Sequence, residues 1–196
     1  MPISIAVFAS GTGSNARRIM EHFQHSDAVQ VRLVVSNKAD AGVLDIAREM
    51  GVETLIIHRE SFYQSEAIVE DLRSRHISFI VLAGFLWLVP AYLVRAFPRA
   101  IVNIHPALLP KFGGKGMYGA HVHEAVKQAG EMETGITIHF VDERYDEGQT
   151  IFQARCPVLP ADTPADIARR VLALEHRHFP VVIEQVLMKL QVVGAP

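Results

Sequence analysis

The amino-acid sequence predicts an α/β protein in which a mostly parallel sheet, covered by helices, ends in an antiparallel hairpin. Two observations support this fold class. Short runs rich in Val and Ile alternate with segments of helical period, which is typical of parallel strands joined by crossover helices. After residue 133 the pattern changes to alternating apolar and polar residues around a turn, which is typical of a hairpin.

Five apolar runs predict the parallel strands, and the segments between them predict helices. The strands are expected at residues 3–9, 29–36, 53–58, 78–84 and 100–105. The helices are expected at residues 14–24, 41–51, 61–75 and 88–97. Gly51 is suited to end the second helix, because glycine readily takes the left-handed conformation found after helix C-termini.

The C-terminal third predicts the hairpin and one long helix. The hairpin strands are GITIHFVD, residues 135–142, and TIFQARCPV, residues 150–158. The helix is expected at 163–190 and begins after the sequence DTP, in which Asp or Thr can cap the helix and Pro suits its first turn. The sequence contains no internal repeat, low-complexity stretch or linker, so we expect a single domain over residues 1–196.

The composition is that of an ordinary globular protein, with 49% hydrophobic residues, 20% charged residues and a formal net charge of -2. The most apolar segment, 79–94, is shorter than the roughly 20 residues of a membrane span. The only cysteine, Cys156, has no partner for an internal disulfide, and the N-terminus MPISIAVFAS lacks the basic region of a signal peptide. We therefore expect a cytoplasmic protein that binds neither nucleic acid nor a membrane.

The sequence SGTGSN, residues 10–15, lies between the first expected strand and the first expected helix. Backbone N–H groups at a helix N-terminus attract anions, and Ser14 and Asn15 add donors, which favours a terminal phosphate. The stretch also fits a GxGxxA dinucleotide fingerprint. However, the acidic residue that should follow roughly 20 residues later is replaced by Asn37 and Lys38. A tight turn with a Ser cap is the structural alternative.

The sequence NIHP, residues 103–106, ends the fifth expected strand. Asn103 and His105 are two residues apart on a strand, so their side chains project from the same face. They also lie at the carboxyl end of the strand, where ligands bind in open α/β sheets. The amide of Asn103 and a protonated His105 can together stabilise an oxyanion. A buried pair that satisfies loop carbonyl groups is the alternative.

A carboxylate near His105 would favour its charged form, because a nearby negative charge raises the pKa of histidine. The turn DERYDEG offers Asp142, Glu143, Asp146 and Glu147. The residues alone do not choose among these four, and an acidic turn exposed to solvent is the other reading.

Four motifs, in order along the chain, resemble those of the phosphoribosylglycinamide formyltransferase family: SGTGSN, LAGF at 82–85, NIHPALLP at 103–110 and HFVDERYDEGQTIFQA at 139–154. The resemblance extends from residue 3 to about residue 187. It implies a formyltransferase fold with a seven-stranded mixed sheet. A Rossmann-like phosphate-binding half (1–100) would be followed by a catalytic and folate-binding half (101–196).

The resemblance also implies an activity, which is the transfer of the formyl group of N10-formyltetrahydrofolate to the amine of glycinamide ribonucleotide in de novo purine synthesis, with no metal. It selects Asp146 as the carboxylate that acts with Asn103 and His105. It implies that the ribonucleotide is bound by Gly13, Ser14, Asn15 and Glu175, the last on the ribose hydroxyls. It implies that folate is bound by Leu86, Trp87, Leu88, Val89, Asp142, Glu143, Arg144 and Tyr145.

Two features depart from the family pattern. Ser65 lies where some members have a basic residue near the folate glutamate. The loop FGGKGMYGAHVHEAV, residues 112–126, is longer and richer in glycine than in many members, and its Lys115 is a candidate contact for the phosphate or the folate tail. His121 and His123 suggest a metal, but residues two apart at a helix start do not converge on one ion.

Three other functions share part of this pattern. A formyltetrahydrofolate hydrolase would carry an extra N-terminal regulatory domain, and a methionyl-tRNA formyltransferase would carry a basic C-terminal domain; we expect neither. A non-catalytic nucleotide or folate sensor would keep the phosphate loop but would not need Asn103, His105 and Asp146. The sequence leaves open whether the protein is a monomer or a homodimer.

Overall fold

The computed structural model describes residues 2–194, with side chains described through residue 190. Its seven strands are β1 (Ile3–Phe8), β2 (Val29–Ser36), β3 (Glu53–Ile56), β4 (Ile77–Leu82), β5 (Ile101–His105), β6 (Glu133–Phe140) and β7 (Thr150–Pro157). They form one sheet in the order β3-β2-β1-β4-β5-β6-β7. The first five strands pair in parallel, and β6 and β7 pair antiparallel. The predicted fold class is therefore confirmed.

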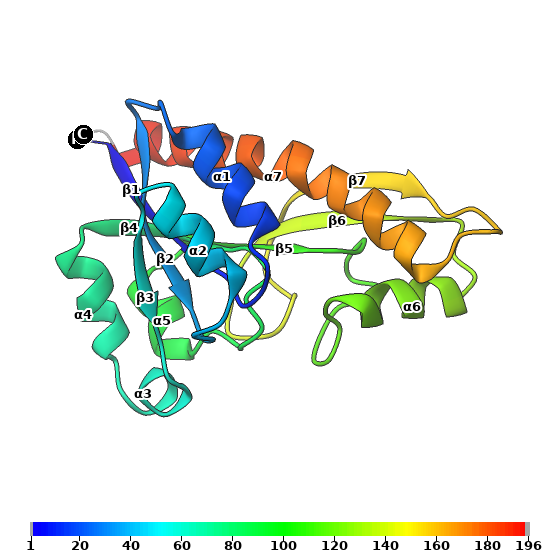
Figure 1. Ribbon diagram of the computed structural model, residues 1–196, viewed down its shortest axis with the longest axis horizontal. Coiled ribbons are helices and arrows are strands. Elements are labelled where there is room, and N and C mark those ends of the chain that lie inside the picture. The colour runs from blue at the N-terminus through cyan, green and yellow to red at the C-terminus, as the bar shows by residue number, and fades with distance from the viewer. Residues whose placement is uncertain (1, 195–196) are drawn as a thin grey trace.

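Helices cover both faces of the sheet (Figure 1). They are α1 (Ser14–Phe23), α2 (Gly42–Glu49), α3 (Arg59–Gln64), α4 (Ala67–Ser74), α5 (Ala91–Ala96), α6 (Ala120–Gln128) and α7 (Pro164–Gly194). Residues of α1, α2, α6 and α7 share one buried cluster with strand residues such as Val7 and Val81. Residues of α3, α4 and α5 share the other cluster with Phe8 and Leu82. Successive residues of β1 and β4 thus enter different cores, which explains their continuous apolar runs.

Two expected helices differ in the structure. The single helix expected at 61–75 is divided into α3 and α4, because Ser65 is extended (φ -138°, ψ 158°). Its hydroxyl donates to the Ser61 carbonyl, which offers the backbone an alternative to continued helix. The helix expected at 88–97 begins only at Ala91, because Pro90 has no N–H and keeps the residue before it extended. Residues 86–89 are therefore free to form part of a cavity wall.

Two expected helix boundaries are confirmed. Gly51 follows the end of α2 with φ 70°, and its N–H donates to the Arg48 carbonyl. At the start of α7, Thr163 is the capping residue: Asp166 N–H donates to Thr163 Oγ1, and Thr163 N–H donates to the Asp166 carboxylate. Such reciprocal bonds satisfy N–H groups that have no partner within the helix.

The topology brings several strand ends to one edge of the sheet. β4 lies between β1 and β5, with Leu82 opposite both Phe8 and Asn103. The loops that follow these three parallel strands therefore meet. β6 enters the same edge from the other direction and places His139 opposite Asn103.

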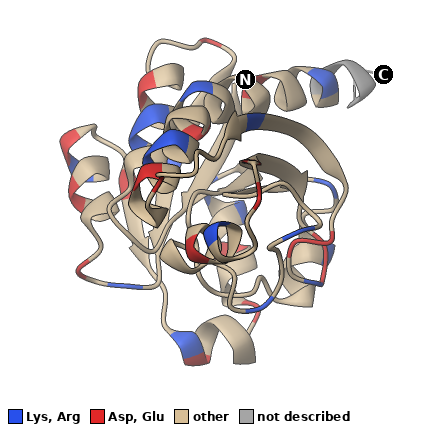
Figure 2. Ribbon diagram, turned by 90° about the vertical axis from the view of Figure 1, so that its right-hand side faces the viewer, with Lys and Arg blue, Asp and Glu red and all other residues tan. Residues whose placement is uncertain are grey.

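The outer surface carries charges of both signs. Figure 2 shows Lys and Arg interspersed with Asp and Glu on the helices that face the viewer, so this side has no extended surface of one sign. Among residues 2–194, no helix combines the length and apolar character that a membrane span requires.

Candidate active site

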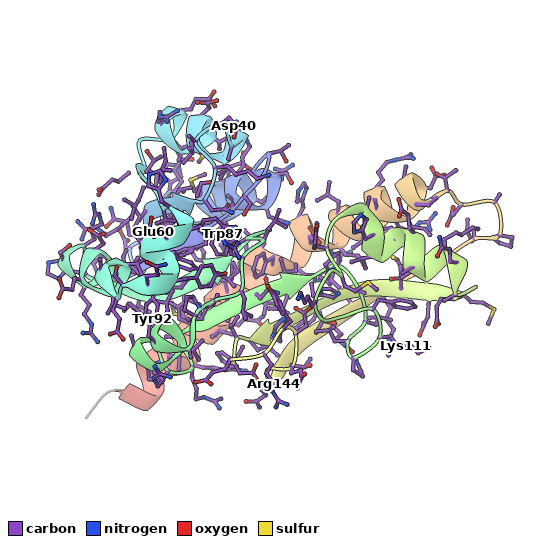
Figure 3. All side chains as sticks on the ribbon, turned by 90° about the horizontal axis from the view of Figure 1, so that it is seen from below. Asp40, Glu60, Trp87, Tyr92, Lys111 and Arg144 are labelled. Atoms are coloured by element: carbon purple, nitrogen blue, oxygen red, sulfur yellow. The ribbon has the colours of Figure 1, made fainter. Side chains whose placement is uncertain are left out.

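A cavity of about 1110 Å³ opens at the edge of the sheet where the strand ends meet. Its wall comes from the segment after β4, the end of β5, the loop before α6, the loop between β6 and β7, and the first half of α7. Trp87 and Arg144 reach this region from different elements (Figure 3). Asn103, His105 and Asp146 line the cavity together with Asn15 and Glu175.

The Asp146 carboxylate lies at the centre of a polar cluster. Its Oδ2 is 3.5 Å from His105 Nδ1, and its Oδ1 is 3.5 Å from His139 Nε2. The Asn103 amide donates to Oδ1 at 3.5 Å and lies 3.2 Å from His139 Nε2. The structure thus brings the three predicted catalytic residues, Asn103, His105 and Asp146, into one network with a second histidine.

The β6–β7 turn aims Asp146, and only Asp146, at His105. Asp142 instead accepts a hydrogen bond from the Arg144 N–H at 2.8 Å, Glu143 lies 3.4 Å from Arg95, and Glu147 lies 2.8 Å from Arg144. Asp146 has φ 57°, a left-handed conformation that Asp tolerates better than most residues. Gly148 is needed two residues later, because a Cβ there would lie 1.7 Å from the Phe140 carbonyl oxygen.

His105 is 3% exposed, and both of its ring nitrogens face an acceptor. Nε2 lies 2.7 Å from the Phe112 carbonyl oxygen, so it must carry the hydrogen of this bond. Burial lowers the pKa of His105 below its ordinary value of 6.5, and the Asp146 charge and the Phe112 carbonyl oppose this effect. The carboxylate therefore acts in the direction expected from the sequence, but burial outweighs it in the ligand-free protein.

Asp146 itself is held in its charged form. Burial acts to raise its pKa, but the neighbouring His139 ring, the charge on His105 and the Gly114 N–H together hold the pKa of Asp146 below its ordinary value. The cluster thus contains a stable negative charge against which a protonated His105 can form.

His139 is a member of the cluster that sequence reasoning did not identify. It is 2% exposed and its Nδ1 donates to the Phe140 carbonyl at 2.9 Å, which leaves Nε2 directed at Asn103 and Asp146. A histidine at the end of an alternating strand, directly before an acidic turn, is the sequence signal that points to it. Its position opposite Asn103 depends on the pairing of β5 with β6, which the sequence does not specify.

At the other end of the cavity, Asn15 and Glu175 meet although 160 positions separate them in the chain. The Asn15 amide donates to Glu175 Oε2 at 2.6 Å, and Asn15 Oδ1 is buried without a hydrogen-bond partner among the described residues. Glu175 is 8% exposed, and burial raises its pKa while the Asn15 bond acts in the opposite direction.

Gly13 and Ser14 lie at the start of α1, next to Asn15, but outside the cavity wall. Gly13 has φ 82°, and a Cβ there would lie 2.7 Å from Val43, so this turn requires glycine. No side chain caps the helix at Gly13. Gly13 is buried and Ser14 is half-buried, and because no side chain caps the helix, the first N–H groups of α1 remain available to an anion.

The predicted folate-binding residues divide into two groups. Six of them line the cavity: Leu86, Trp87, Leu88, Val89, Arg144 and Tyr145. Asp142 and Glu143 instead bond within their turn and to α5. The Leu86 N–H donates to Ser10 Oγ at 3.0 Å, which ties this wall to the loop after β1.

The long loop before α6 also contributes to the cavity, through Lys115, Tyr118 and, at the start of the helix, His123. His123 is 6% exposed, whereas His121 is exposed and its ring centroid lies 5.4 Å from that of Tyr118. The two histidines therefore do not converge. In the part of the chain that the structure describes, no three His, Cys, Asp or Glu side chains are grouped to hold a metal ion.

Comparison with known proteins identifies relatives over almost the whole chain. The chain is 44% identical over 185 residues to the chloroplastic phosphoribosylglycinamide formyltransferase of Arabidopsis thaliana, covering 91% of this chain and 63% of that protein. It is 34% identical over 185 residues to phosphoribosylglycinamide formyltransferase of Haemophilus influenzae, covering 92% and 85%. The chain thus spans less than two thirds of the length of the plant relative and most of the length of the bacterial one.

Solved structures agree with these relatives. The crystal structure of glycinamide ribonucleotide transformylase 1 from Symbiobacterium toebii superposes with a TM-score of 0.88 at 36% identity, covering 96% of this chain and 89% of that one. Residues 3–183 match the formyl transferase family as a whole. The resemblance carried by the four motifs is confirmed, and the chain belongs to the formyl transferase family, among relatives named phosphoribosylglycinamide formyltransferase.

Proposed function

We propose that this protein transfers the formyl group of N10-formyltetrahydrofolate to the primary amine of glycinamide ribonucleotide, a step of de novo purine synthesis. One observation carries the proposal: Asp146 lies beside both His105 and Asn103 on the wall of a cavity that Asn15 and Glu175 also line. The names of its relatives support the same activity. The phosphate-binding role belongs mainly to residues 1–100, and the catalytic role to residues 101–196.

The chemistry needs oxyanion stabilisation and the movement of one proton. A bond forms between the amine nitrogen and the formyl carbon while negative charge develops on the formyl oxygen, and the bond from that carbon to N10 then breaks. The amine loses one proton and N10 gains one. Asn103 donates a hydrogen bond to the developing oxyanion, and the positive charge of protonated His105 stabilises it. To supply a proton, one ring N–H of His105 must turn from its acceptor, the Phe112 carbonyl or Asp146, to the substrate.

Asp146 acts through His105. Its carboxylate orients the imidazole through the 3.5 Å contact at Nδ1 and favours the imidazolium form. It also helps to move the proton released by the amine, directly or through water. The Asn103 amide donates to the opposite oxygen of Asp146 and to His139 Nε2, so His139 helps to keep both groups in position.

The cavity fits a folate at one end. Leu86, Trp87, Leu88 and Val89 form a mostly apolar wall, and Tyr145 faces the same space from the β6–β7 turn. Apolar and aromatic surfaces suit a flat pterin ring. Arg144 also lines this end. Asp142 and Glu143 support the turn that carries Arg144 and Tyr145, through a bond to the Arg144 N–H and a contact with α5.

The opposite end fits the ribonucleotide. Backbone N–H groups at Gly13 and Ser14, together with the Asn15 amide, suit the phosphate at the positive end of α1. Glu175 suits the ribose hydroxyls, because a carboxylate can accept two hydrogen bonds from a diol. The unpartnered Asn15 Oδ1 is available to a hydroxyl of the same ligand.

The test is a folate absorbance assay at neutral pH with N10-formyl folate, run with and without glycinamide ribonucleotide. Deformylation that depends on the ribonucleotide is the expected result. Turnover that does not need the ribonucleotide would make the protein a hydrolase, and no turnover by a protein that binds either ligand would make it a sensor. Lys189→Ala changes an exposed position of α7 away from the cavity wall. It is the control for activity lost during purification and should turn over like wild type.

A further inference from the structure

We propose that the glycine loop, residues 112–119, positions the His105–Asp146 pair, and that Gly113 is the residue that allows the loop to do so. The expected effect on kcat rests on the proposed function, whereas the hydrogen bonds from which we argue do not depend on it. Neither the family resemblance nor the mechanism above gives this loop a role in positioning the pair.

The loop bonds to both members of the pair. His105 Nε2 donates to the Phe112 carbonyl at 2.7 Å. The Gly114 N–H donates to Asp146 Oδ2 at 2.9 Å, and this same oxygen lies 3.5 Å from His105 Nδ1. A closed ring therefore runs from His105 through Phe112, Gly113 and Gly114 to Asp146 and back. Moving the loop changes both catalytic groups at once.

The ring fixes how His105 carries its hydrogens. The Phe112 carbonyl can only accept, so the neutral imidazole is held with its hydrogen on Nε2 and with a lone pair at Nδ1 facing a carboxylate. In the imidazolium form, each N–H instead has an acceptor. The loop thus favours the charged form of His105 and opposes the effect of burial.

The other titratable groups around His105 come from two further elements. His139 on β6 acts to lower the pKa of His105. His123 on α6 faces it as well, and the charge on His105 acts to lower the pKa of His123. Among these groups only Asp146 favours a charged His105, so its placement by the Gly114 N–H matters.

The backbone is strained at both ends of the ring. Phe112 has φ 57° and Asp146 has φ 57°, in the left-handed region that a bulky residue such as Phe rarely adopts. Such conformations cost on the order of 1 to 3 kcal/mol each and persist where the surroundings hold them. The Phe112 conformation directs its carbonyl at His105, which is a geometric reason for the strain.

Gly113 permits this close approach. A Cβ at position 113 would lie 2.5 Å from Leu109 Cδ2 and 3.3 Å from Asp146 Cβ. The Leu109 methyl is the end of a flexible side chain and can rotate away, but Asp146 is held by its own bonds. A larger side chain at 113 therefore pushes the loop away from Asp146. A second cavity of about 520 Å³ is lined by Gly113, Gly114 and Asp146 beside this contact.

The test is NMR on the ligand-free protein labelled with ¹⁵N-histidine, in which His105 is assigned by comparison with His105→Gln. Wild-type protein should show His105 in the Nε2–H tautomer at high pH. Gly113→Val should lose this preference and lower the pKa of His105. Gly113→Ala, in which only the Asp146 contact remains after Leu109 moves, should give a smaller shift in the same direction.

Lys115→Ala is the matched control, because it shortens a side chain of the same loop that bonds to neither His105 nor Asp146; it should keep the wild-type tautomer and pKa. A folded Gly113→Val protein with wild-type tautomer and pKa would overturn the proposal. If Gly113→Val does not fold, an unshifted His105 in Gly113→Ala overturns it instead. In the formyl transfer assay, kcat of Gly113→Val should fall roughly 10- to 100-fold. The pH at which kcat changes because His105 titrates should be lower in Gly113→Val than in wild type. The NMR result needs no substrate, so a failure of the proposed function would leave it intact.

Discussion

The side chains proposed for catalysis are more completely paired than those proposed to bind the ribonucleotide; we call the two parts of the cavity the catalytic end and the ribonucleotide end. At the catalytic end, Asn103, His105, His139 and Asp146 bond to one another and to backbone groups. At the ribonucleotide end, one hydrogen bond joins Asn15 to Glu175, and Asn15 Oδ1 is buried without a partner among the described residues. Burial also raises the pKa of Glu175.

The difference suggests that the catalytic end is preorganised for a transition state, whereas the ribonucleotide end is completed by its ligand. Groups that stabilise a transition state work best when they are already held in place, because no free energy is then spent on orienting them during the reaction. Groups that bind a ground-state ligand can remain incompletely paired until the ligand arrives, at a cost to the stability of the free protein. Changes at the two ends should therefore affect different quantities.

The largest effect is expected for Asn103→Ala. Removing one oxyanion donor costs on the order of 3 kcal/mol of barrier, so kcat should fall roughly 100-fold or more. The KM for the ribonucleotide should change little, since Asn103 lies at the catalytic end. Steady-state kinetics and circular dichroism on the same preparation check both statements. A folded variant with unchanged kcat would show that Asn103 has no such role.

Glu175→Gln should change binding and not chemistry. The Asn15 bond can be kept, but a charged acceptor for the ribose hydroxyls is lost, so the KM for the ribonucleotide should rise about 10-fold, equivalent to about 1.4 kcal/mol. The value of kcat should stay within about twofold. A large fall in kcat at unchanged KM would remove the distinction between the two ends.

The same variant has a predicted effect on stability. Burial raises the pKa of Glu175 above its ordinary 4.5, so the unfolded chain releases this proton at lower pH than the folded protein does. The folded state therefore loses stability as pH rises from about 4.5 through the raised pKa. Glu175→Gln lacks this loss, and its free energy of unfolding should exceed that of wild type increasingly as pH rises. Urea denaturation at several pH values measures this, and a parallel pH dependence in the two proteins would contradict it.

At the catalytic end, two buried histidines should make the free energy of unfolding depend on pH in the opposite direction. Burial lowers the pKa of His105 and of His123 below 6.5, so the unfolded chain binds these protons first as pH falls. The free energy of unfolding should therefore decrease below about pH 6.5, by about 1.4 kcal/mol for each unit of pKa difference. His105→Gln should show a shallower decrease than wild type. An identical decrease in both proteins would mean that His105 does not contribute.

The smallest effect is expected at the apolar wall. The Arg59 guanidinium lies 5.8 Å from the centre of the Trp87 ring and 5.2 Å from that of Tyr63. Exposed contacts of this kind are worth about 0.5 to 1 kcal/mol, so Arg59→Ala should raise the KM for folate about two- to fivefold and leave the KM for the ribonucleotide unchanged. Arg73→Ala, on the exposed side of α4, is the control. Equal effects of the two variants would show that the Trp87 contact is irrelevant.

Much of the fold follows from local pattern. The parallel strands could be predicted because they are buried on both faces and appear as continuous apolar runs. The end of α2 and the start of α7 could be predicted because the conformational preference of Gly51 and the capping preference of Thr163 act locally. The break at Ser65 could not be predicted. A serine within a helical pattern ends the helix only where its hydroxyl forms a backbone hydrogen bond that replaces the helical one.

The site shows the same division. Asn103 and His105 could be paired from their spacing on one strand. Choosing Asp146 needed the family resemblance, because four acidic residues in one turn differ only in the direction that the backbone gives them. The contacts between Asn15 and Glu175, and between Asn103 and His139, join elements far apart in the chain. They arise from sheet order and helix packing, which no local pattern encodes.

The left-handed backbone of Asp146 limits which sequences can evolve at this position. Asn and Gly share the tolerance of Asp for this conformation, whereas Glu, which keeps the charge, adopts it less readily. A library randomised at this codon and selected only for folded protein should be enriched in Asp, Asn and Gly, whereas other residues, such as the Phe at position 112, take this conformation at a cost of roughly 1 to 2 kcal/mol. Selection for growth without external purines should then leave Asp alone. If Asp146 has the proposed role, the usual exchange of Asp for Glu is therefore disfavoured here by backbone conformation as well as by side-chain length.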